Sequence, residues 1–351
     1  MIKKVLLRNF RNYGYLEVEL SEGINSLVGR NGLGKTNFLE ALFLLCEGKA
    51  LRALKVEELI KKGEEEGEVK AILLVSGTES VKKATIKGSG IEFKKSHPRG
   101  DVRAIAMLPD DIAFVKSGPE ARRKEIDAAI SRIKPGYGKD LADYARVVRQ
   151  RNELLRDIRA GKRAREELHH WNSLLLGLGT RIVEDRLSFL TEIKKAMEEI
   201  LRRLGKSGLE IRYYSSLRHA EVEESKSFLR RMEVAEIRRG QTMVGPHRDE
   251  IIFLLEGRNV RRESSQGEQK IATITWKLAL GDLYTERGED VILLLDDCLS
   301  ELDDGNAESV LRELESRDQV IITDAVCRSQ LLKYRLVDLE GVLRYWGNTI
   351  D

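Results

Sequence analysis

The chain has 351 residues, which is enough for two domains and a large buried core. Hydrophobic residues make up 41% and charged residues 34%, so we expect a soluble globular protein. The sequence contains no run of 18 apolar residues, so no membrane span is expected. The formal net charge of +3 is too small to identify a partner, and an aromatic content of 6% argues against a surface that stacks single-stranded bases.

Residues 2–7 and 15–20 alternate between apolar and polar side chains, which predicts a β-hairpin. The turn between the two strands contains Arg11 and Asn12. Two interpretations of these residues remain open: a solvated turn, or one wall of a nucleotide-binding pocket.

Residues 29–36, GRNGLGKT, match the pattern G-x-x-x-x-G-K-[ST], which cradles the phosphates of a nucleotide. Its glycines allow backbone N–H groups to turn inward, and the N-terminus of the helix predicted after the loop favours an anion. Lys35 is expected to reach the β- and γ-phosphates, and Thr36 to ligate Mg²⁺. The alternative is a glycine-rich turn with an incidental lysine. The residues expected to bind the nucleotide are Gly29, Arg30, Asn31, Gly32, Leu33, Gly34, Lys35, Thr36 and Asn37, with Arg11 and Asn12 from the hairpin.

The next part of the chain changes from strand-like to helical patterns. A run of antiparallel strands is predicted at residues 69–75, 81–87, 91–94 and 102–108. Helices are predicted at residues 119–131, 140–160 and 164–204. Residues 116–165 hold 15 lysines and arginines against 7 aspartates and glutamates, so positive charge is concentrated there. This charge fits either a solvated helix surface or a sequence-neutral contact with a nucleic-acid backbone.

A strand is then predicted at residues 209–214, a charged helix at about 221–238 and a further strand at 251–255. Residues 264–269, SSQGEQ, precede a helix with one apolar side. These residues suit a simple N-terminal cap, and they also suit a second anion-binding site at a helix N-terminus.

Residues 291–295, VILLL, predict a central strand that is buried on both faces, and Asp296 and Asp297 follow it directly. Ligands bind at the carboxyl ends of strands in open α/β sheets. We therefore expect Asp296 to hold Mg²⁺, directly or through water, and Asp297 to orient or deprotonate a water molecule. Residues 320–323 predict one more central strand.

The cysteines Cys46, Cys298 and Cys327 are odd in number and show no C-x-x-C spacing. This pattern predicts neither a disulfide framework nor a zinc site. A reducing cytosol fits this pattern, so a cytoplasmic location is expected. The apolar run at the N-terminus is too short before charge returns to form a signal peptide.

In this order, the motifs resemble the ABC/SMC class of ATPase heads, and within it they are similar to the RecF family of bacterial recombination mediators. The class motifs are residues 29–37, 264–268, 292–297 and 299–303, the last being similar to the D-loop. The segments similar to RecF alone are residues 9–13, 118–123 with Asp127, 150–154 and 244–249. The resemblance implies an α/β P-loop ATPase head with a mixed sheet and an antiparallel β-subdomain. The head would comprise residues 1–117 and 209–351, and an inserted all-helical arm residues 118–208.

In this class two heads sandwich two ATP molecules, which implies that Ser265 and Gly267 contact the nucleotide of the partner chain. The implied catalytic residues are Lys35, Asp296 and Asp297, and the implied Mg²⁺ ligands are Thr36 and Asp296. The resemblance also implies an ATP-dependent homodimer on double-stranded DNA and duplex–single-strand junctions. It would act in recombinational repair at gaps and help load recombinase through a RecR-type mediator protein, with weak, DNA-stimulated ATP hydrolysis releasing the dimer. The residues expected to contact DNA are Arg122, Arg123, Lys124, Arg146, Arg149 and Arg151.

Some residues depart from the wider class. Gln266 stands where the signature motif usually has a second glycine, and Asp297 stands where most of the class has glutamate, which predicts slow hydrolysis. No histidine follows the strand that ends at Thr323, which disfavours the alternative of a transporter ATPase subunit. The short helical insert disfavours an SMC-like tether, and a small-molecule kinase would have no use for a signature motif. Residues 107–111 are the candidate region for the glutamine loop.

Overall fold

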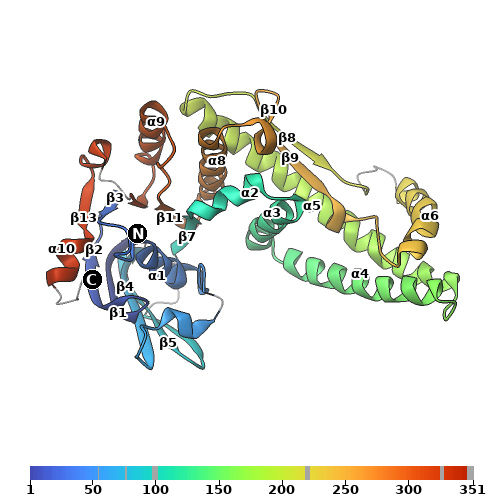
Figure 1. Ribbon diagram of the computed structural model, residues 1–351, viewed down its shortest axis with the longest axis horizontal. Coiled ribbons are helices and arrows are strands. Elements are labelled where there is room, and N and C mark those ends of the chain that lie inside the picture. The colour runs from blue at the N-terminus through green and yellow to red at the C-terminus, as the bar shows by residue number, and fades with distance from the viewer. Residues whose placement is uncertain (54, 76, 97–101, 218–221, 325–327, 346–351) are drawn as a thin grey trace. The chain divides into compact units, whose positions relative to one another are not determined.

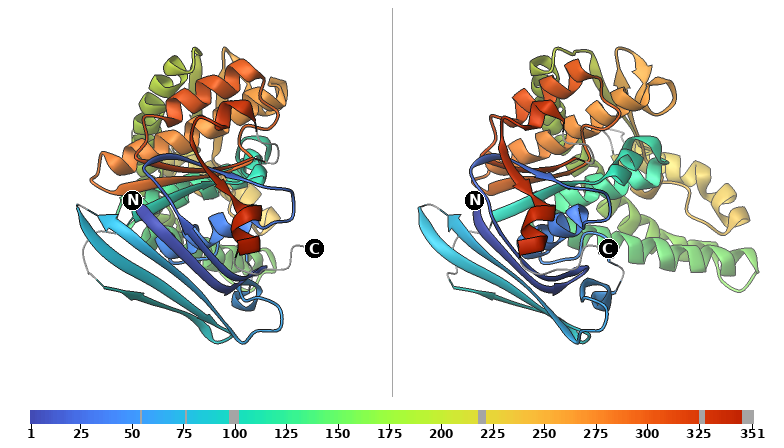
Figure 2. Two further views of the ribbon diagram at one scale, coloured as in Figure 1. Left: turned by 90° about the vertical axis from the view of Figure 1, so that its left-hand side faces the viewer. Right: turned by 60° about the vertical axis from the view of Figure 1, so that its left-hand side comes forward.

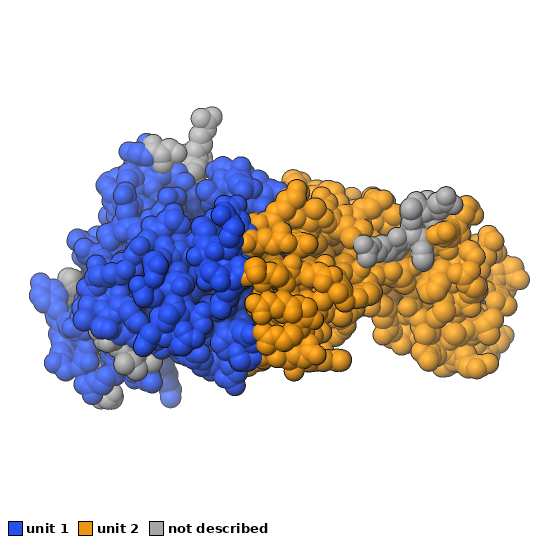
Figure 3. All heavy atoms as spheres, turned by 90° about the horizontal axis from the view of Figure 1, so that it is seen from above, with its two compact units in different colours: residues 1–112, 199–206, 265–351 blue, residues 113–198, 207–264 orange. Residues whose placement is uncertain are grey.

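The computed structural model describes residues 1–53, 55–75, 77–96, 102–217, 222–324 and 328–345, and Figure 1 shows its helices and strands. The chain divides into two compact units, which Figure 3 distinguishes by colour. Unit 1 comprises residues 1–112, 199–206 and 265–351, and unit 2 comprises residues 113–198 and 207–264. The chain therefore enters unit 2 twice.

The expected domain division differs from these units chiefly over residues 209–264, which the sequence assigns to the head and the structure groups with the helical arm. It also differs over residues 113–117, expected in the head and found in unit 2, and over residues 199–206, expected in the arm and found in unit 1. Three short strands in this region form a sheet of their own in the order β10-β9-β8. The strand β9 of this region packs against the arm helix α3, and its helix α6 packs against the arm helix α4. Packing against the arm thus explains why this segment leaves the head.

Unit 1 contains an antiparallel sheet in the order β2-β1-β4-β5-β6. Its strands are β1 (Ile2–Phe10), β2 (Tyr13–Glu19), β4 (Glu66–Val75), β5 (Thr78–Lys87) and β6 (Gly90–Lys95). The predicted N-terminal hairpin is confirmed, since β1 and β2 pair antiparallel with Phe10 opposite Tyr13. In β4 buried residues alternate with more exposed ones, as expected of a sheet covered on one face.

The second sheet of unit 1 is parallel, in the order β13-β3-β12-β11-β7. Its strands are β3 (Gly23–Val28), β7 (Val102–Met107), β11 (Asp290–Asp296), β12 (Gln319–Thr323) and β13 (Arg335–Asp338). The prediction that residues 102–108 continue the antiparallel run is wrong, because β7 pairs parallel with β11. All but one of the residues of β7 are buried, which is typical of a strand in a sheet covered on both faces.

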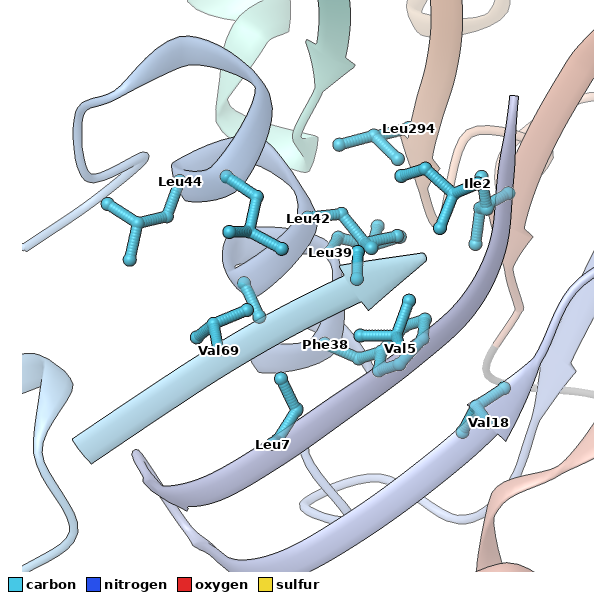
Figure 4. Close-up of a cluster of buried hydrophobic side chains, with 14 of the residues drawn as sticks. Ile2, Val5, Leu7, Val18, Phe38, Leu39, Leu42, Leu44, Val69 and Leu294 are labelled. Atoms are coloured by element: carbon cyan, nitrogen blue, oxygen red, sulfur yellow. The ribbon is translucent and has the colours of Figure 1, made fainter. Parts of the chain in front are cut away.

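The helix α1 (Lys35–Glu47) lies between the two sheets, and α8 (Gln266–Thr285) also packs on the parallel sheet (Figure 2). Successive side chains of β11 contact different helices. Leu294 belongs to the core around α1, whereas Leu293 lies against Gly281 of α8. Figure 4 shows side chains of α1 packed among those of the antiparallel sheet and Leu294. This core fixes α1, and therefore the loop before it, against both sheets.

The other helices of unit 1 are short: η1 (Val56–Leu59), η2 (Pro109–Ile112), α9 (Asp304–Leu314), η5 (Ser329–Leu331) and α10 (Leu339–Tyr345). Cys46 and Cys298 are buried free thiols, and Cys327 lies outside the described residues. Within the described part of the chain, no helix has the length and apolar character needed to cross a membrane.

Unit 2 is built mainly from helices. They are α2 (Ala113–Lys116), α3 (Pro119–Ile133), α4 (Tyr137–Arg159), η3 (Arg165–Glu167), α5 (Leu168–Arg203), α6 (Val222–Arg239), η4 (Pro246–Arg248) and α7 (Val260–Glu263). Its strands are β8 (Leu209–Tyr214), β9 (Glu250–Leu255) and β10 (Arg258–Asn259). The helical prediction for residues 119–204 is confirmed, and the last residues of α5 belong to unit 1. Residue 221 of the predicted helix at 221–238 lies outside the described residues.

Candidate functional site

The glycine-rich loop lies between β3 and α1 and curls around its own lysine. Gly29, Gly32 and Gly34 have φ angles of +152°, +87° and +96°, a region that L side chains rarely adopt. The Lys35 ammonium donates hydrogen bonds to the carbonyl oxygens of Gly29, at 2.5 Å, and Arg30, at 3.1 Å. No side chain in the described chain caps the N-terminus of α1, so its first N–H groups remain available to an anion.

The N-terminal hairpin supports this loop from behind. Asn12 donates to the carbonyl oxygen of Leu33 at 3.1 Å, and the Tyr13 hydroxyl donates to that of Gly34 at 2.8 Å. Arg11 donates instead to the fully buried carboxylate of Glu40 on α1, at 2.8 Å. The hairpin turn therefore supports the backbone of the phosphate loop, and Glu40 of α1 holds the Arg11 guanidinium.

The two carboxylates predicted after the central strand meet this loop at the edge of the parallel sheet. Asp296 ends β11, and its two oxygens accept hydrogen bonds from the hydroxyls of Thr36 and Thr323, each at 2.6 Å. Thr323 ends β12, and parallel strands end at the same edge of a sheet, which explains its position. Asp297 has a φ of 49°, and its N–H is 3.2 Å from both the carbonyl and hydroxyl oxygens of Thr323.

The Lys35 ammonium shares this edge of the sheet with several carboxylates. Burial lowers the pKa of Lys35, and the carboxylates of Asp296, Asp297 and Asp324 oppose that shift. One ammonium thus faces several carboxylates, an arrangement that favours a bound cation next to a bound anion.

A cavity of about 380 Å³ opens at this edge. Eight predicted site residues line it, namely Asn31, Gly32, Gly34, Lys35, Thr36, Asn37, Asp296 and Asp297. Gly29, Arg30, Leu33, Arg11 and Asn12 are predicted site residues that do not line it. The structure thus brings the loop and both carboxylates together around one cavity, and the volume of this cavity is in the range of small-molecule binding sites.

Three lining residues were not predicted as site residues: Arg52, Pro109 and Thr323. Arg52 donates to the side-chain oxygen of Asn37 at 3.0 Å. Pro109 lies within residues 107–111, the segment selected as the candidate glutamine loop. Thr323 could have been found as the polar residue that ends a predicted central strand, whereas no local pattern distinguishes Arg52.

The second candidate anion site lies apart from this cavity. Ser265 caps α8: its hydroxyl accepts from the N–H of Glu268 at 3.3 Å, and the Glu268 carboxylate accepts from the N–H of Ser265 at 2.7 Å. Ser265 and Gln266 are exposed, and neither Ser265 nor Gly267 belongs to the cavity lining. Within one chain the signature segment is a capped helix N-terminus that does not line the phosphate loop's cavity.

Lys270 connects α8 to the turn that follows β11. Its ammonium donates to the carbonyl oxygens of Asp297, at 2.9 Å, and Ser300, at 2.8 Å, and to the Ser300 hydroxyl at 2.5 Å. Lys270 is 2% exposed, and burial lowers its pKa. The helix that begins with the signature segment therefore holds the turn that carries Asp297.

Two of the six basic residues predicted to contact DNA are buried, and that part of the prediction is corrected. Arg122 is 4% exposed and pairs with Glu250, and Arg151 is 0% exposed and pairs with the equally buried Glu236. Each guanidinium balances a carboxylate that lies far along the chain. Neither side chain is available to a DNA backbone.

The other four basic residues reach the surface of unit 2 to different extents. Arg123 is half-buried and donates to the carbonyl oxygen of Asp249 at 2.6 Å. Lys124, Arg146 and Arg149 are exposed, and Arg146 lies 3.3 Å from the carboxylate of Asp143. These four retain the exposure that a phosphate contact requires.

Comparison with known proteins agrees with this arrangement. The family model of the RecF/RecN/SMC N terminal domain matches residues 1–333. A relative from Pelotomaculum thermopropionicum, named DNA replication and repair protein RecF, is 34% identical over 340 residues, which cover 92% of this chain and 93% of the relative. A protein of the same name from Heliobacterium modesticaldum is 36% identical over 341 residues, covering 92% and 91%.

Solved structures extend the match to the fold. A structure of the recombination mediator protein RecF-ATPrS in the RecFOR pathway is 31% identical, with a TM-score of 0.77 and coverage of 96% of this chain and 97% of that one. The corresponding RecF-ATP structure is 32% identical, with a TM-score of 0.75 and coverage of 93% and 92%. An Smc head, 18% identical with a TM-score of 0.54, shares the fold. The chain therefore belongs to the RecF family, within the wider group of RecF, RecN and SMC proteins.

Proposed function

We propose that this protein binds ATP in the cavity between the glycine-rich loop and β11. The observation that carries the proposal is the meeting of Lys35 and Thr36 with Asp296 at one edge of the parallel sheet. The loop N–H groups and the free N-terminus of α1 would bind the phosphates, and Lys35 would exchange its two carbonyl partners for phosphate oxygens. The RecF-ATP structures of relatives support this assignment.

The donor set at the end of β11 also fits Mg²⁺, which prefers oxygen ligands and keeps several waters. The Thr36 hydroxyl and the Asp296 carboxylate are already 2.6 Å apart, so both can serve one cation. Bound there, Mg²⁺ would neutralise charge on the phosphates during hydrolysis. Asp297 would orient or deprotonate the attacking water from a backbone that the Thr323 hydrogen bonds and Lys270 hold in place.

We propose that Ser265 and Gly267 act on the nucleotide of a second copy of the chain. They begin a long helix, and Ser265 is exposed, but they do not line the cavity of their own chain. A phosphate held by both copies would favour the dimer, and its hydrolysis would release it. Because the aspartate side chain is one methylene shorter than the usual glutamate, hydrolysis is expected to be slow.

The proposed biological role is an ATP-dependent, double-stranded DNA-binding protein of recombinational repair in the cytoplasm. The relatives are named for DNA replication and repair, and the solved ones as recombination mediators in the RecFOR pathway. Weak ATPase activity stimulated by DNA, action at gaps and duplex–single-strand junctions, and recombinase loading through a RecR-type protein complete the proposal. Arg123, Lys124, Arg146 and Arg149 would provide part of the DNA surface.

The test is light scattering of the wild type and Lys35→Ala, with and without ATP and Mg²⁺, followed by addition of duplex DNA. The wild type should double in mass with ATP and then bind the duplex, whereas Lys35→Ala should do neither. Circular dichroism should show that both proteins are folded. A wild type that stays monomeric at saturating ATP would refute the dimer.

Mixing variants tests the trans arrangement. Ser265→Asp keeps a good helix cap but sets a negative charge against a phosphate, and Ser265→Asn is its neutral control. Neither Lys35→Ala nor Ser265→Asp should hydrolyse ATP alone. Their mixture should regain activity, because a mixed dimer combines an intact Lys35 from one copy with an intact Ser265 from the other. A mixture as inactive as its components would show that the two residues do not act across copies.

A further inference from the structure

Four arginines gather where two helices of unit 2 end. Arg156 and Arg159 belong to the last turn of α4, and Arg238 and Arg239 to the last turn of α6, which packs against α4 (Figure 1). We call these four residues the arginine cluster. None of them belongs to the DNA surface proposed above.

Gly240, directly after α6, shows how closely the two helix ends approach. A Cβ atom at this position would lie 2.7 Å from Cγ of Arg156 and 3.4 Å from Nη1 of Arg159. The same Nη1 atom is 3.5 Å from the carbonyl oxygen of Arg238. The arginines of α4 thus lie over the glycine that ends α6, beside the two arginines of that helix.

All four guanidinium groups are exposed and lack a carboxylate partner among the described residues. Three acidic residues of unit 2 are already paired with other arginines: Glu236 pairs with Arg151, Glu233 with Arg165, and Glu167 with Arg163. Among the described residues, weak contacts hold two of the four side chains: Arg159 donates to the Arg238 carbonyl oxygen, and Arg239 to the Met243 sulfur, each at 3.5 Å. Within the part of the chain that the structure describes, no carboxylate therefore forms an ion pair with the arginine cluster.

Helix capping accounts for only one weak contact of these arginines, the one from Arg159 to the Arg238 carbonyl oxygen. The carbonyl oxygens at the end of α6 accept from the N–H of Gly240, which lies 2.7 Å from Glu236 and 3.1 Å from Ile237. At the end of α4, the N–H of Ala160 donates to the Arg156 carbonyl oxygen at 3.0 Å. Basic residues often stabilise helix C-termini, but here backbone N–H groups satisfy these carbonyl oxygens.

We propose that the arginine cluster binds the phosphate backbone of double-stranded DNA, without reading sequence. The proposal rests on the DNA-binding function proposed above and adds a second contact surface to it. Guanidinium groups match phosphate oxygens in geometry and charge. An acidic protein surface would be the other polyanion, but protein interfaces are built around an apolar core. Near the cluster, Val234 is the one large hydrophobic residue of α6 that is strongly exposed within the described chain.

The test compares the wild type with a variant in which all four arginines are replaced by glutamine, by duplex binding with ATP over a range of salt concentrations. Each phosphate contact contributes about 0.9 to the slope of log K against log salt, so losing two to four contacts should lower the slope by about 2–4. Duplex affinity at 0.1 M salt should fall by at least about tenfold. Lysine at the four positions should restore most of both quantities, since phosphate contact depends mainly on charge.

The control removes four other exposed cations, each paired with a carboxylate on unit 1: Lys87, Lys94, Arg312 and Lys333. This control has the same net charge as the cluster variant and should keep the wild-type slope. If the cluster variant also keeps the wild-type slope and affinity, the proposal is wrong. If it loses binding to polyglutamate but not to duplex DNA, the cluster faces an acidic protein and the proposal is equally wrong. A wild type that binds no duplex would instead refute the proposed function.

Discussion

Replacing Lys270 with methionine should destabilise unit 1 and slow ATP turnover at least tenfold while leaving ATP binding largely intact. Methionine keeps the unbranched apolar part of the side chain and removes the ammonium. That group donates three hydrogen bonds, two to Ser300 and one to the Asp297 carbonyl oxygen. Since Asp297 has a φ of 49°, its turn depends on such external support.

The magnitude follows from two opposing terms. A hydrogen bond from a charged group contributes about 1.5–3 kcal/mol, so three bonds would give about 5–9 kcal/mol if they were independent. Burying the ammonium costs several kcal/mol, and the lowered pKa of Lys270 reports that cost. The net loss on mutation to methionine should be about 3 kcal/mol. Ser300→Ala removes one of the three acceptors and should cost about 1 kcal/mol.

Urea unfolding followed by circular dichroism measures the stability change, and a fluorescent ATP analogue and phosphate release measure binding and turnover. Lys35, Thr36 and Asp296 do not contact Lys270 through any of these bonds, so the analogue should bind within about threefold of the wild type. Turnover should fall at least tenfold. A Lys270→Met protein within 1 kcal/mol of the wild type, or one that hydrolyses ATP normally, would refute the supporting role of this ammonium.

Three further predictions concern unit 2. Arg151→Met should cost about 3–5 kcal/mol in urea unfolding because it leaves a buried carboxylate unpaired, whereas the exposed neighbour Arg149→Gln should change stability by less than about 0.5 kcal/mol. Gly245→Ala should also be strongly destabilising, since φ is +126° and the added Cβ would lie 2.1 Å from the Tyr144 hydroxyl oxygen. Adding Tyr144→Phe should recover only part of the lost stability, because the backbone strain remains. Full recovery in the double variant would exclude backbone strain. Burial lowers the pKa of His247 to about 4, so the unfolded chain takes up a proton near pH 6.5 that the folded chain resists. Stability should therefore fall by about 2 kcal/mol from pH 7 to 5, and His247→Gln should abolish this component.

The phosphate loop and the carboxylates were predictable because each is a short, local pattern. A glycine-rich loop between a strand and a helix, and an apolar strand that ends in Asp296 and Asp297, constrain both backbone and position. Parallel pairing then places Thr323 beside Asp296. Arg52 has no such pattern, because its place in the cavity lining depends on how the chain returns after α1.

The sheet that contains β7 could not be predicted from its own residues. An apolar strand that follows three antiparallel ones is most simply added to their sheet, yet β7 pairs with β11, nearly 190 residues further along the chain. The burial of Arg122 and Arg151 was unpredictable for the same reason. Their partners Glu250 and Glu236 come from the second passage of the chain through unit 2.

Three of the four segments that distinguish the RecF family in the sequence lie inside unit 2, and the fourth, residues 9–13, supports the phosphate loop in unit 1. Arg186 makes two hydrogen bonds of 2.8 Å to the carboxylate of Asp127 and one of 3.2 Å to that of Asp249. The Asp249 carboxylate also accepts from the Tyr213 hydroxyl, and Asn152 accepts from the N–H of Thr242 at 2.6 Å. Arg186 thus joins Asp127 to residues 244–249, and Thr242 joins Asn152 to the same segment, because its carbonyl oxygen lies 3.2 Å from Nε2 of His247.

These contacts give residues 246–249 a role that the sequence left open. Arg186, in the first segment of unit 2, donates to the Pro246 carbonyl oxygen at 2.8 Å and to the Asp249 carboxylate at 3.2 Å. Pro246 and Asp249 belong to the second segment, so these bonds connect the two segments. Removing one member would leave buried charge unpaired, so the group can change only as a whole. Family signatures of this kind reflect the packing of unit 2, whereas the motifs shared with the wider ATPase class lie in unit 1 around the cavity. The two sets of motifs are therefore expected to respond differently to mutation: the first through stability, the second through nucleotide binding and turnover.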